Sequence, residues 1–304
     1  MPVTSPDESS GRPATGASAA GVARVAGVAG VAGVGGVAGV AIVTGASRGI
    51  GVGIATELAR AGYDVALWAR DAESITELAA TLTRNHGLRS LAVECDVRDE
   101  ASVVAATDAV VAALGVPTAL VNNAAVSRRH RLEDLSTEDW DDVIGTNLRG
   151  PFLCTRTVGR HMLAAGRGAI VNVASVAASV PQPFFGAYSP GKAGLVALTT
   201  QTAVEWGGRG VRCNAISPGF VPTAASATVY ADPDLRAQRQ AMVPVGRLGT
   251  PEDMGRAVVF LVSDQASYVN GVNLFVDGGF SRTLIDQVPA LGPDGRFINV
   301  RSGA

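Results

Sequence analysis

The chain has 304 residues and a formal charge of −2. This charge gives no indication of the basic surface that would attract nucleic acid or an acidic membrane. Hydrophobic residues make up 47% of the chain and charged residues 17%, a globular composition for one large domain. Three widely spaced cysteines and three histidines, without a CxxC or HExxH motif, predict no disulfide framework and no metal site, and they favour a cytoplasmic protein.

Residues 1–38 are a low-complexity segment that begins polar and passes into Val-Ala-Gly triplets from about Gly21. Glycine opposes helix formation, and Gly and Ala supply little free energy of transfer, so a membrane-spanning helix is disfavoured. Asp7 and Glu8 do not suit the basic start of a signal peptide. We expect a disordered N-terminal tail, and a membrane anchor is the alternative.

Residues 39–280 alternate short apolar runs with longer helical patterns. The runs that predict strands are 40–43, 64–68, 90–93, 118–121, 169–173, 211–216 and 273–276. The helical patterns are 50–61, 72–85, 100–114, 137–165, 187–206 and 251–262. Apolar strands separated by helices predict an α/β fold with a doubly wound parallel sheet, Rossmann-type, in a single domain. Residues 281–304 are a C-terminal extension without a strong pattern.

A glycine-rich loop, T-G-A-S-R-G-I-G at 44–51, joins the first predicted strand to the first predicted helix. Glycines at this point allow a tight turn and a close approach of the backbone to a pyrophosphate, which the helix N-terminus stabilises. No Gly-Lys-Ser/Thr follows, so a P-loop is disfavoured. The loop therefore predicts a dinucleotide site, and a role in helix packing alone is the competing interpretation.

The second predicted strand ends in Ala69-Arg70, where a dinucleotide fold usually places an acid for the ribose 2′-hydroxyl. Arg70, with Arg48 from the glycine-rich loop, would instead pair with a 2′-phosphate through charge-assisted contacts. The sequence therefore predicts NADP rather than NAD. The alternative is that Asp71 takes the role of the acid and that NAD binds.

Tyr188 and Lys192 are four residues apart in a predicted helix and so share one face. A cation beside a phenol lowers the phenol pKa from about 10, which allows proton exchange with an alcohol or ketone. Ser175 follows the strand at 169–173, at the sheet edge where α/β proteins bind ligands, and would donate to a carbonyl oxygen. Each motif alone also fits a structural role, but together they predict carbonyl chemistry.

At these motifs the chain resembles the short-chain dehydrogenase/reductase family, over about residues 39–280. The motifs follow the order of that family: 44–51, Cys95-Asp96-Val97, Asn122-Asn123-Ala124-Ala125, Asn147, Ser175, Tyr188 with Lys192, Ser217-Pro218-Gly219 and Val276-Asp277-Gly278-Gly279. One departure is Ala125, where the family usually has glycine. Its methyl group would lie near the cofactor, and we expect it to be tolerated.

The resemblance implies a role for each catalytic residue. Tyr188 would be the acid/base, and Ser175 would orient the substrate oxygen. Lys192 would lower the phenol pKa and bind the nicotinamide ribose, and Asn147 would hold a water of a proton relay. The residues that the resemblance assigns to the cofactor are Gly45, Ser47, Arg48, Gly49, Ile50, Gly51, Arg70, Asp96, Val97, Asn123, Ala124, Ala125, Tyr188, Lys192, Pro218, Gly219, Val221 and Thr223.

Residues 223–244 correspond to the variable lid of the family. Candidate pocket residues are Val126, Ala177, Phe184, Phe185, Phe220 and Tyr230. Because Phe184 and Phe185 come just before Tyr188, we predict an apolar or cyclic carbonyl substrate. The competing interpretation is that one of these phenylalanines is a core residue. The sequence has no cluster of arginines of the kind that would indicate a phosphorylated or CoA substrate.

We therefore predict an NADP(H)-dependent oxidoreductase, of the carbonyl reductase or alcohol dehydrogenase type, that interconverts a secondary alcohol and a ketone. One alternative is an NAD-dependent polyol or alcohol dehydrogenase. Another is a non-catalytic cofactor-sensing protein, which would not need the full Asn147, Ser175, Tyr188 and Lys192 set.

The resemblance also implies a homotetramer, formed by the helices at 137–165 and 187–206, with a further interface at strand 272–279 and the C-terminal tail. We expect no nucleic acid, membrane or metal partner.

Overall fold

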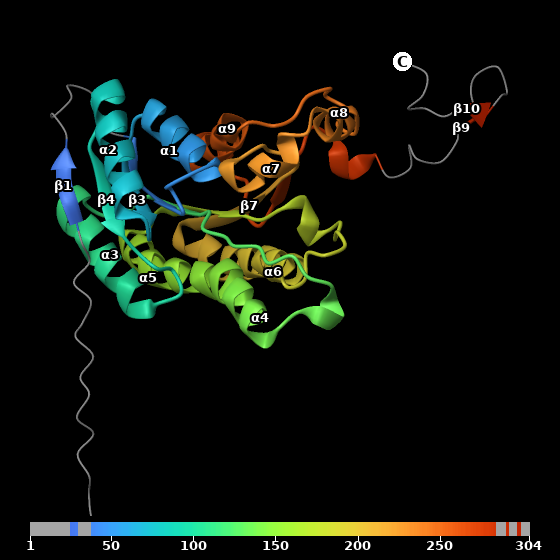
Figure 1. The fold of residues 1–304 in the computed structure, drawn as a ribbon. Coiled ribbons are helices and arrows are strands. Elements are labelled where there is room, and N and C mark those ends of the chain that lie inside the picture. The colour runs from blue at the N-terminus through green and yellow to red at the C-terminus, as the bar shows by residue number, and fades with distance from the viewer. Residues whose placement is uncertain (1–24, 30–37, 284–289, 292–296, 299–304) are drawn as a thin grey trace, which may run out of the picture.

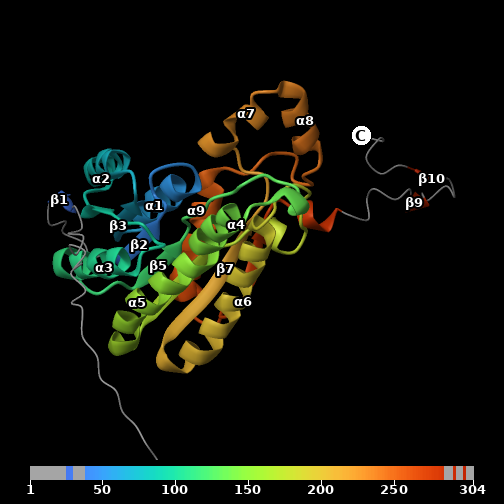
Figure 2. The ribbon, with the colours of Figure 1, turned by 60° about the horizontal axis from the view of Figure 1, so that its bottom comes forward.

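The computed structural model describes residues 25–29, 38–283, 290–291 and 297–298, and its centre is a parallel sheet with helices on both faces (Figures 1 and 2). Along the sheet the parallel strands run in the order β4-β3-β2-β5-β6-β7-β8. Their bounds are β2 (Gly39–Thr44), β3 (Tyr63–Ala69), β4 (Ser90–Glu94), β5 (Ala119–Asn122), β6 (Gly168–Val173), β7 (Val211–Pro218) and β8 (Asn273–Val276). All seven predicted strands and the doubly wound fold are confirmed.

An eighth strand, β1 (Val25–Ala29), pairs antiparallel with β4 at the edge of this sheet, with Val25 opposite Val93. The expectation of a disordered tail therefore differs from the structure over β1, while 1–24 and 30–37 lie outside the described residues. In the C-terminal extension, β9 (Ala290–Leu291) pairs with β10 (Phe297–Ile298). The unpaired backbone of the β4 edge explains why a Val-Ala-Gly segment can add a strand there.

The helices pack in two layers. Those on one face are α1 (Ile50–Arg60), α2 (Ala72–His86) and α9 (Pro251–Val262), and those on the other are α3 (Glu100–Leu114), α5 (Gly150–Ala165) and α6 (Tyr188–Trp206). The helix predicted at 137–165 is two helices, α4 (Thr137–Ile144) and α5, joined by a π-helical segment over Gly145–Arg149. The lid contains α7 (Ala227–Tyr230) and α8 (Pro233–Ala241). None of the helices among the described residues is long and apolar enough to cross a bilayer.

Helices α1 and α9 approach closely because glycines face one another across their contact. A Cβ atom on Gly53 would lie 2.4 Å from the carbonyl carbon of Pro251, and one on Gly255 would lie 2.6 Å from Cγ of Glu57. Interiors are packed at crystal-like density, so a methyl group at either position would push the helices apart. This contact fixes α1, and with it the glycine-rich loop at its N-terminus.

Candidate active site

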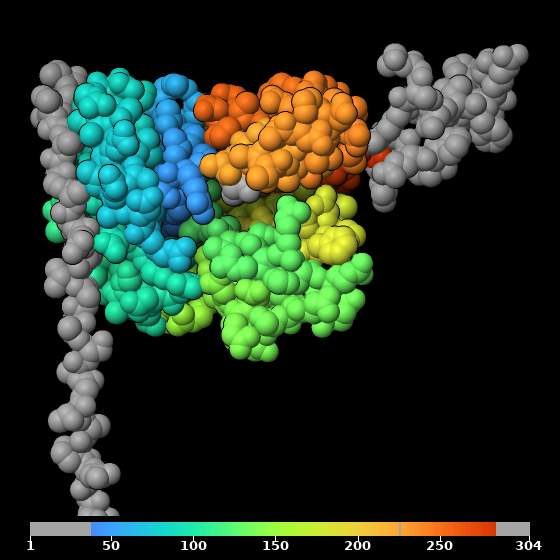
Figure 3. All heavy atoms as spheres, in the orientation of Figure 1, coloured from blue at the N-terminus to red at the C-terminus, as the bar shows by residue number. Residues whose placement is uncertain are grey.

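A cavity of about 690 Å³ opens at the carboxyl ends of the parallel strands. Figure 3 shows the surface hollowed between the lid, in orange, and the green segment that includes α4. The strand order places β3 and β4 on one side of β2, and β6 and β7 on the other. The loops after these strands therefore form two ends of the cavity. We call the part near Arg48, Arg70 and Asp96 the cofactor end, and the part near Arg129, Phe185, Phe220, Tyr230 and Arg239 the substrate end.

The glycine-rich loop has the conformation that a pyrophosphate site requires. Gly45 and Gly49 have φ values of 64° and 59°, in the left-handed region that favours glycine. A Cβ atom on Gly45 would lie 2.7 Å from Cα of Ala124, and one on Gly51 would lie 2.3 Å from the carbonyl oxygen of Gly45. No side chain caps the N-terminus of α1, so its free N–H groups are available to an anion. The loop thus fits a dinucleotide.

A hydroxyl and an amide hold this loop against the end of β5. Oγ1 of Thr44 accepts from the backbone N–H groups of Asn123 and Ala124, both at 3.0 Å. The side-chain amide of Asn123 donates to the carbonyl oxygens of Thr44 and Gly45 at 2.9 and 3.0 Å. Gly51 lies behind this contact and does not line the cavity, whereas the other residues that the sequence assigns to the cofactor all line it.

Arg48 and Arg70 are exposed at the cofactor end, and no described carboxylate forms an ion pair with either of them. Asp71 caps the N-terminus of α2, so its carboxylate already has hydrogen-bond partners. Its Oδ1 accepts from the N–H of Ser74 at 3.1 Å and its Oδ2 from the Ser74 hydroxyl at 2.6 Å. These hydrogen bonds, with a smaller contribution from the charge of Arg48, hold the pKa of Asp71 below its usual range. Two cations at this end suit a phosphate better than a hydroxyl.

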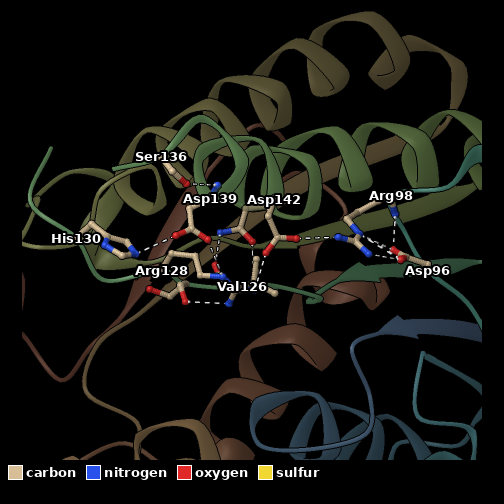
Figure 4. Close-up of polar contacts among 10 residues, drawn as sticks. Asp96, Arg98, Val126, Arg128, His130, Ser136, Asp139 and Asp142 are labelled. Carbon is tan, nitrogen blue, oxygen red and sulfur yellow. Dashed lines mark hydrogen bonds and ion pairs between the residues drawn. The ribbon is translucent and has the colours of Figure 1, made fainter. Parts of the chain in front are cut away.

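A chain of alternating charges runs from the cofactor end to the loop before α4 (Figure 4). Arg98 joins its two halves, because its NH2 lies 2.7 Å from Oδ2 of Asp96 and its NH1 lies 2.7 Å from Oδ1 of Asp142. Arg128 and Asp139 continue it to Nε2 of His130, 2.9 Å from Oδ2 of Asp139. The hydrogen bonds from Arg98, opposed by partial burial, hold the pKa of Asp96 below its usual range. The chain ties the end of β4 to α4.

Tyr188 and Lys192 begin α6, and Lys192 is the only lysine of the protein. The Lys192 side chain is 2% exposed, its Nζ donates to the carbonyl oxygen of Val173 at 2.6 Å, and Nζ lies 5.8 Å from the centre of the Tyr188 ring. Burial lowers the pKa of Lys192 to about 7. Burial raises the pKa of Tyr188, opposed by its hydrogen bond with Ser175. The predicted lowering of the phenol pKa is therefore wrong for the protein without cofactor, because burial of the phenol raises its pKa and the Lys192 amine bonds to Val173 instead.

Ser175 follows β6, and its Oγ accepts from the N–H of Ala177 at 3.1 Å. Asn147 lies in the π-helical segment, fully buried, and its side-chain amide makes two hydrogen bonds of 2.9 Å with the backbone of Val126. Asn147 does not line the cavity. It packs against α6 one residue before Lys192, since a Cβ atom on Gly191 would lie 3.4 Å from its Cβ. The structure thus brings Ser175, Tyr188 and Lys192 to the cavity and places Asn147 behind them.

Aromatic rings form the substrate end. The Phe185 and Tyr188 rings are 5.4 Å apart, and the Phe220 and Phe280 rings are 4.4 Å apart. Val126, Ala177, Phe185, Phe220 and Tyr230, which the sequence assigns to the substrate pocket, line the cavity.

The prediction for Phe184 is wrong, because this residue has a φ of 67° that turns its ring away, under the guanidinium of Arg131 at 5.2 Å. Phe184 is 51% exposed, so it is not a core residue either.

Sequence reasoning missed several residues of the cavity. Arg129, Gln182, Arg239 and Phe280 line it. Arg129 lies four residues after the 122–125 motif and Phe280 follows the 276–279 motif directly, so their positions in the sequence could have indicated them. Arg239 is one of several charged residues of the lid, and only the packing of α8 distinguishes it from the others.

The comparisons with known proteins agree with this geometry. A family model described as Enoyl-(Acyl carrier protein) reductase matches residues 45–281. The chain is 44% identical over 240 residues to D-threitol dehydrogenase of Mycolicibacterium smegmatis, covering 79% of this chain and 92% of that one. It is 42% identical over 241 residues to cis-4-hydroxycyclohexanecarboxylate dehydrogenase of Sinomonas cyclohexanicum, covering 79% and 95%. A solved gluconate 5-dehydrogenase from Burkholderia cenocepacia, in complex with NADP and tartrate, has a TM-score of 0.76 at 33% identity and covers 80% and 95%.

The fold, the loop and the Tyr188–Lys192 pair define a Rossmann-type oxidoreductase that uses NAD(P). The chain belongs to the short-chain dehydrogenase/reductase family, as its motifs predict. It is an NAD(P)-dependent enzyme that acts on alcohols or ketones.

Proposed function

We propose that the protein is an NADP(H)-dependent oxidoreductase that interconverts a secondary alcohol and a ketone, with an apolar or cyclic carbonyl compound as substrate. The observation that carries this proposal is the single cavity shared by the glycine-rich loop, the Arg48 and Arg70 cations, and the side chains of Ser175 and Tyr188. Cofactor and substrate would therefore meet beside the phenol.

The nicotinamide supplies the hydride transfer when it is bound. Tyr188 protonates the ketone oxygen in reduction and takes the hydroxyl proton in oxidation. Ser175 donates a hydrogen bond to the same oxygen, which opposes the charge that develops there. Lys192 binds the ribose and restores the Tyr188 proton, and Asn147 holds the loop at Val126 and the water that links Lys192 to solvent. Among the described residues, the Lys192 amine has its hydrogen bond with the carbonyl oxygen of Val173, so we expect the amine to reorient toward the cofactor.

Arg48 and Arg70 support NADP over NAD, because Asp71 uses both carboxylate oxygens on Ser74. The test compares kcat/KM for NADPH and NADH on one ketone, in wild type and in Arg70→Asp. We expect a preference for NADPH that falls or reverses in the variant. A clear preference of the wild type for NADH would overturn the NADP assignment.

The relatives favour two kinds of substrate. The relative named for cis-4-hydroxycyclohexanecarboxylate supports a cyclic compound, in agreement with the rings of Phe185 and Phe220 at the cavity. The relative named for D-threitol supports the second candidate, a polyol dehydrogenase. A panel of cyclic ketones, aryl ketones and polyols, followed through nicotinamide absorbance, distinguishes them. Higher kcat/KM for polyols would refute the apolar or cyclic substrate.

The expected homotetramer and cytoplasmic location also belong to this proposal. The exposed Phe152 on α5 and Val204 on α6, at 43% and 78% exposure, support an interface along these helices. Cys95, Cys154 and Cys213 are free and buried, which suits a reducing compartment. Light scattering at micromolar concentration tests the assembly, and a monomer would contradict it.

A further inference from the structure

We infer that the substrate carries a carboxylate, bound by Arg239 and Arg129 at the substrate end of the cavity. This inference rests on the proposed function, because it names the class of the alcohol or ketone on which Tyr188 acts. It departs from the purely apolar pocket that the sequence predicts, since the aromatic rings and the two cations share one space.

The charges that line the cavity are unevenly distributed. Asp71 and Asp96 are the acids among its lining residues, and both lie at the cofactor end. Both are already engaged, Asp71 by Ser74 and Asp96 by Arg98. At the substrate end the lining residues within the described part of the chain include Arg129 and Arg239 and no acid. Positive charge without a counter-ion in a cavity raises the local concentration of an anionic ligand.

Arg239 lies beside two aromatic rings of the substrate end. Its guanidinium carbon lies 5.2 Å from the centre of the Phe220 ring and 5.2 Å from the centre of the Tyr230 ring. Cation–π contacts of this kind attract a guanidinium without using its N–H groups, so these groups remain able to donate to a carboxylate. In the described part of the chain, the Arg239 side chain has no ion pair and no hydrogen bond. The residue is half-buried, so an anion bound there is partly shielded from water.

Arg129, which is exposed, lies beside the aromatic ring that neighbours Tyr188. Its guanidinium carbon lies 5.1 Å from the centre of the Phe185 ring, which in turn is 5.4 Å from the Tyr188 ring. Phe185 thus lies close to both the cation and the phenol. A cyclic compound with both a carboxylate and a carbonyl would contact Arg129 and Tyr188 while its apolar body lies against Phe185.

Helix α8 provides a matched control. Arg236 lies one turn before Arg239 on the same helix, is exposed, and is absent from the residues that line the cavity. Both positions carry the same charge, so Arg236→Met and Arg239→Met change the net charge of the lid equally. A difference between the two variants therefore reports the position of the cation, and not the overall field of the lid.

The experiment measures kcat/KM for a cyclohexanone carboxylate and its uncharged carboxamide, with NADPH. We expect wild type to favour the carboxylate by about 10- to 100-fold, as one charge-assisted pair would give. Arg239→Met and Arg129→Met should each reduce this ratio about tenfold, mainly through KM, while Arg236→Met leaves it unchanged. Calorimetry with the carboxylate and the NADP-bound protein should show the same order of affinities.

The outcomes separate this inference from the proposed function. Turnover of both compounds with a ratio near one, or a ratio that neither Arg239→Met nor Arg129→Met changes, overturns the carboxylate site and leaves the oxidoreductase in place. Absence of NADPH binding, measured by fluorescence, together with absence of turnover on either compound, overturns the proposed function and this inference with it.

Discussion

The Nζ atom of Lys192 lies 2.6 Å from the carbonyl oxygen of Val173, the last residue of β6. This contact joins the first turn of α6 to the strand end that leads to Ser175. It holds the amine in a site that is 2% exposed, with the phenol ring of Tyr188 beside it. Tyr188 and Lys192 are therefore positioned by the packing of α6 on β6.

We predict that Lys192 titrates near neutral pH in the protein without cofactor. Burial lowers its pKa from 10.5 to about 7. Because Lys192 is the only lysine, a protein labelled selectively in lysine gives one side-chain NMR signal, whose pH dependence reports this pKa directly. A titration midpoint near that of an exposed lysine would contradict the buried site.

The lowered pKa of Lys192 also predicts a pH dependence of the free energy of unfolding. Between pH 7 and 10.5 the unfolded chain binds the Lys192 proton and the folded chain does not, so the free energy of unfolding rises with pH across this window. The slope from this group is at most about 1.4 kcal/mol per pH unit. Urea titrations of wild type and Lys192→Met should differ by this slope. Parallel curves across the window would argue against a buried neutral amine.

An ion pair between the half-exposed Arg89 and the buried Asp64 carboxylate, at the far end of the sheet, predicts a loss of stability when it is broken. Asp64 is 1% exposed, and Oδ2 of its carboxylate accepts from Nε and NH2 of Arg89 at 2.8 and 2.5 Å. Arg89→Met removes the charged partner, although the backbone N–H of residue 89 still donates to Oδ1 of Asp64 at 2.9 Å, and this costs about 1–3 kcal/mol of unfolding free energy. Asp64→Asn combined with Arg89→Met should recover part of the loss. Urea denaturation is the measurement, and a loss below about 1 kcal/mol would show that the pair is not needed.

The close contact of α1 with α9 predicts the effect of one methyl group. Gly53→Ala places a Cβ atom 2.4 Å from the carbonyl carbon of Pro251, so the helices must separate, at a cost of about 1–3 kcal/mol. Gly208→Ala is the control, because nothing lies within 4 Å of the added atom. Equal stability of the two variants would contradict the described packing. Because α1 carries the glycine-rich loop, Gly53→Ala should also weaken NADPH binding.

The sequence predicts the parts of this protein that depend on local pattern. The seven parallel strands are continuous apolar runs between helical patterns, and the motif residues lie at their ends because the topology brings those ends together. The π-helical segment around Asn147 was not predicted, because the helical pattern in the sequence continues without a break through 137–165. The turn at Phe184 was not predicted either, because a positive φ at a phenylalanine depends on surrounding contacts and not on the conformational preference of the residue.

Features that depend on contacts between distant segments were not predictable. The position of Arg239 beside the Phe220 and Tyr230 rings requires the packing of α8 near Phe220. The strand β1 requires the free edge of β4, since its own residues have no strand pattern distinct from the rest of the tail. The direction of the Tyr188 pKa depends on burial, whereas the spacing of Tyr188 and Lys192 in the sequence indicates only their proximity.

The most direct test of the central claim is the Tyr188→Phe variant. It removes one hydroxyl oxygen and keeps the ring that packs 5.4 Å from Phe185, so the fold and the cofactor end should be unchanged. We predict that the variant binds NADPH as wild type does and loses ketone turnover by at least about 100-fold, because proton transfer by a positioned side chain contributes that much or more. Turnover close to that of wild type would contradict the assignment of Tyr188 as the acid and base of the reaction.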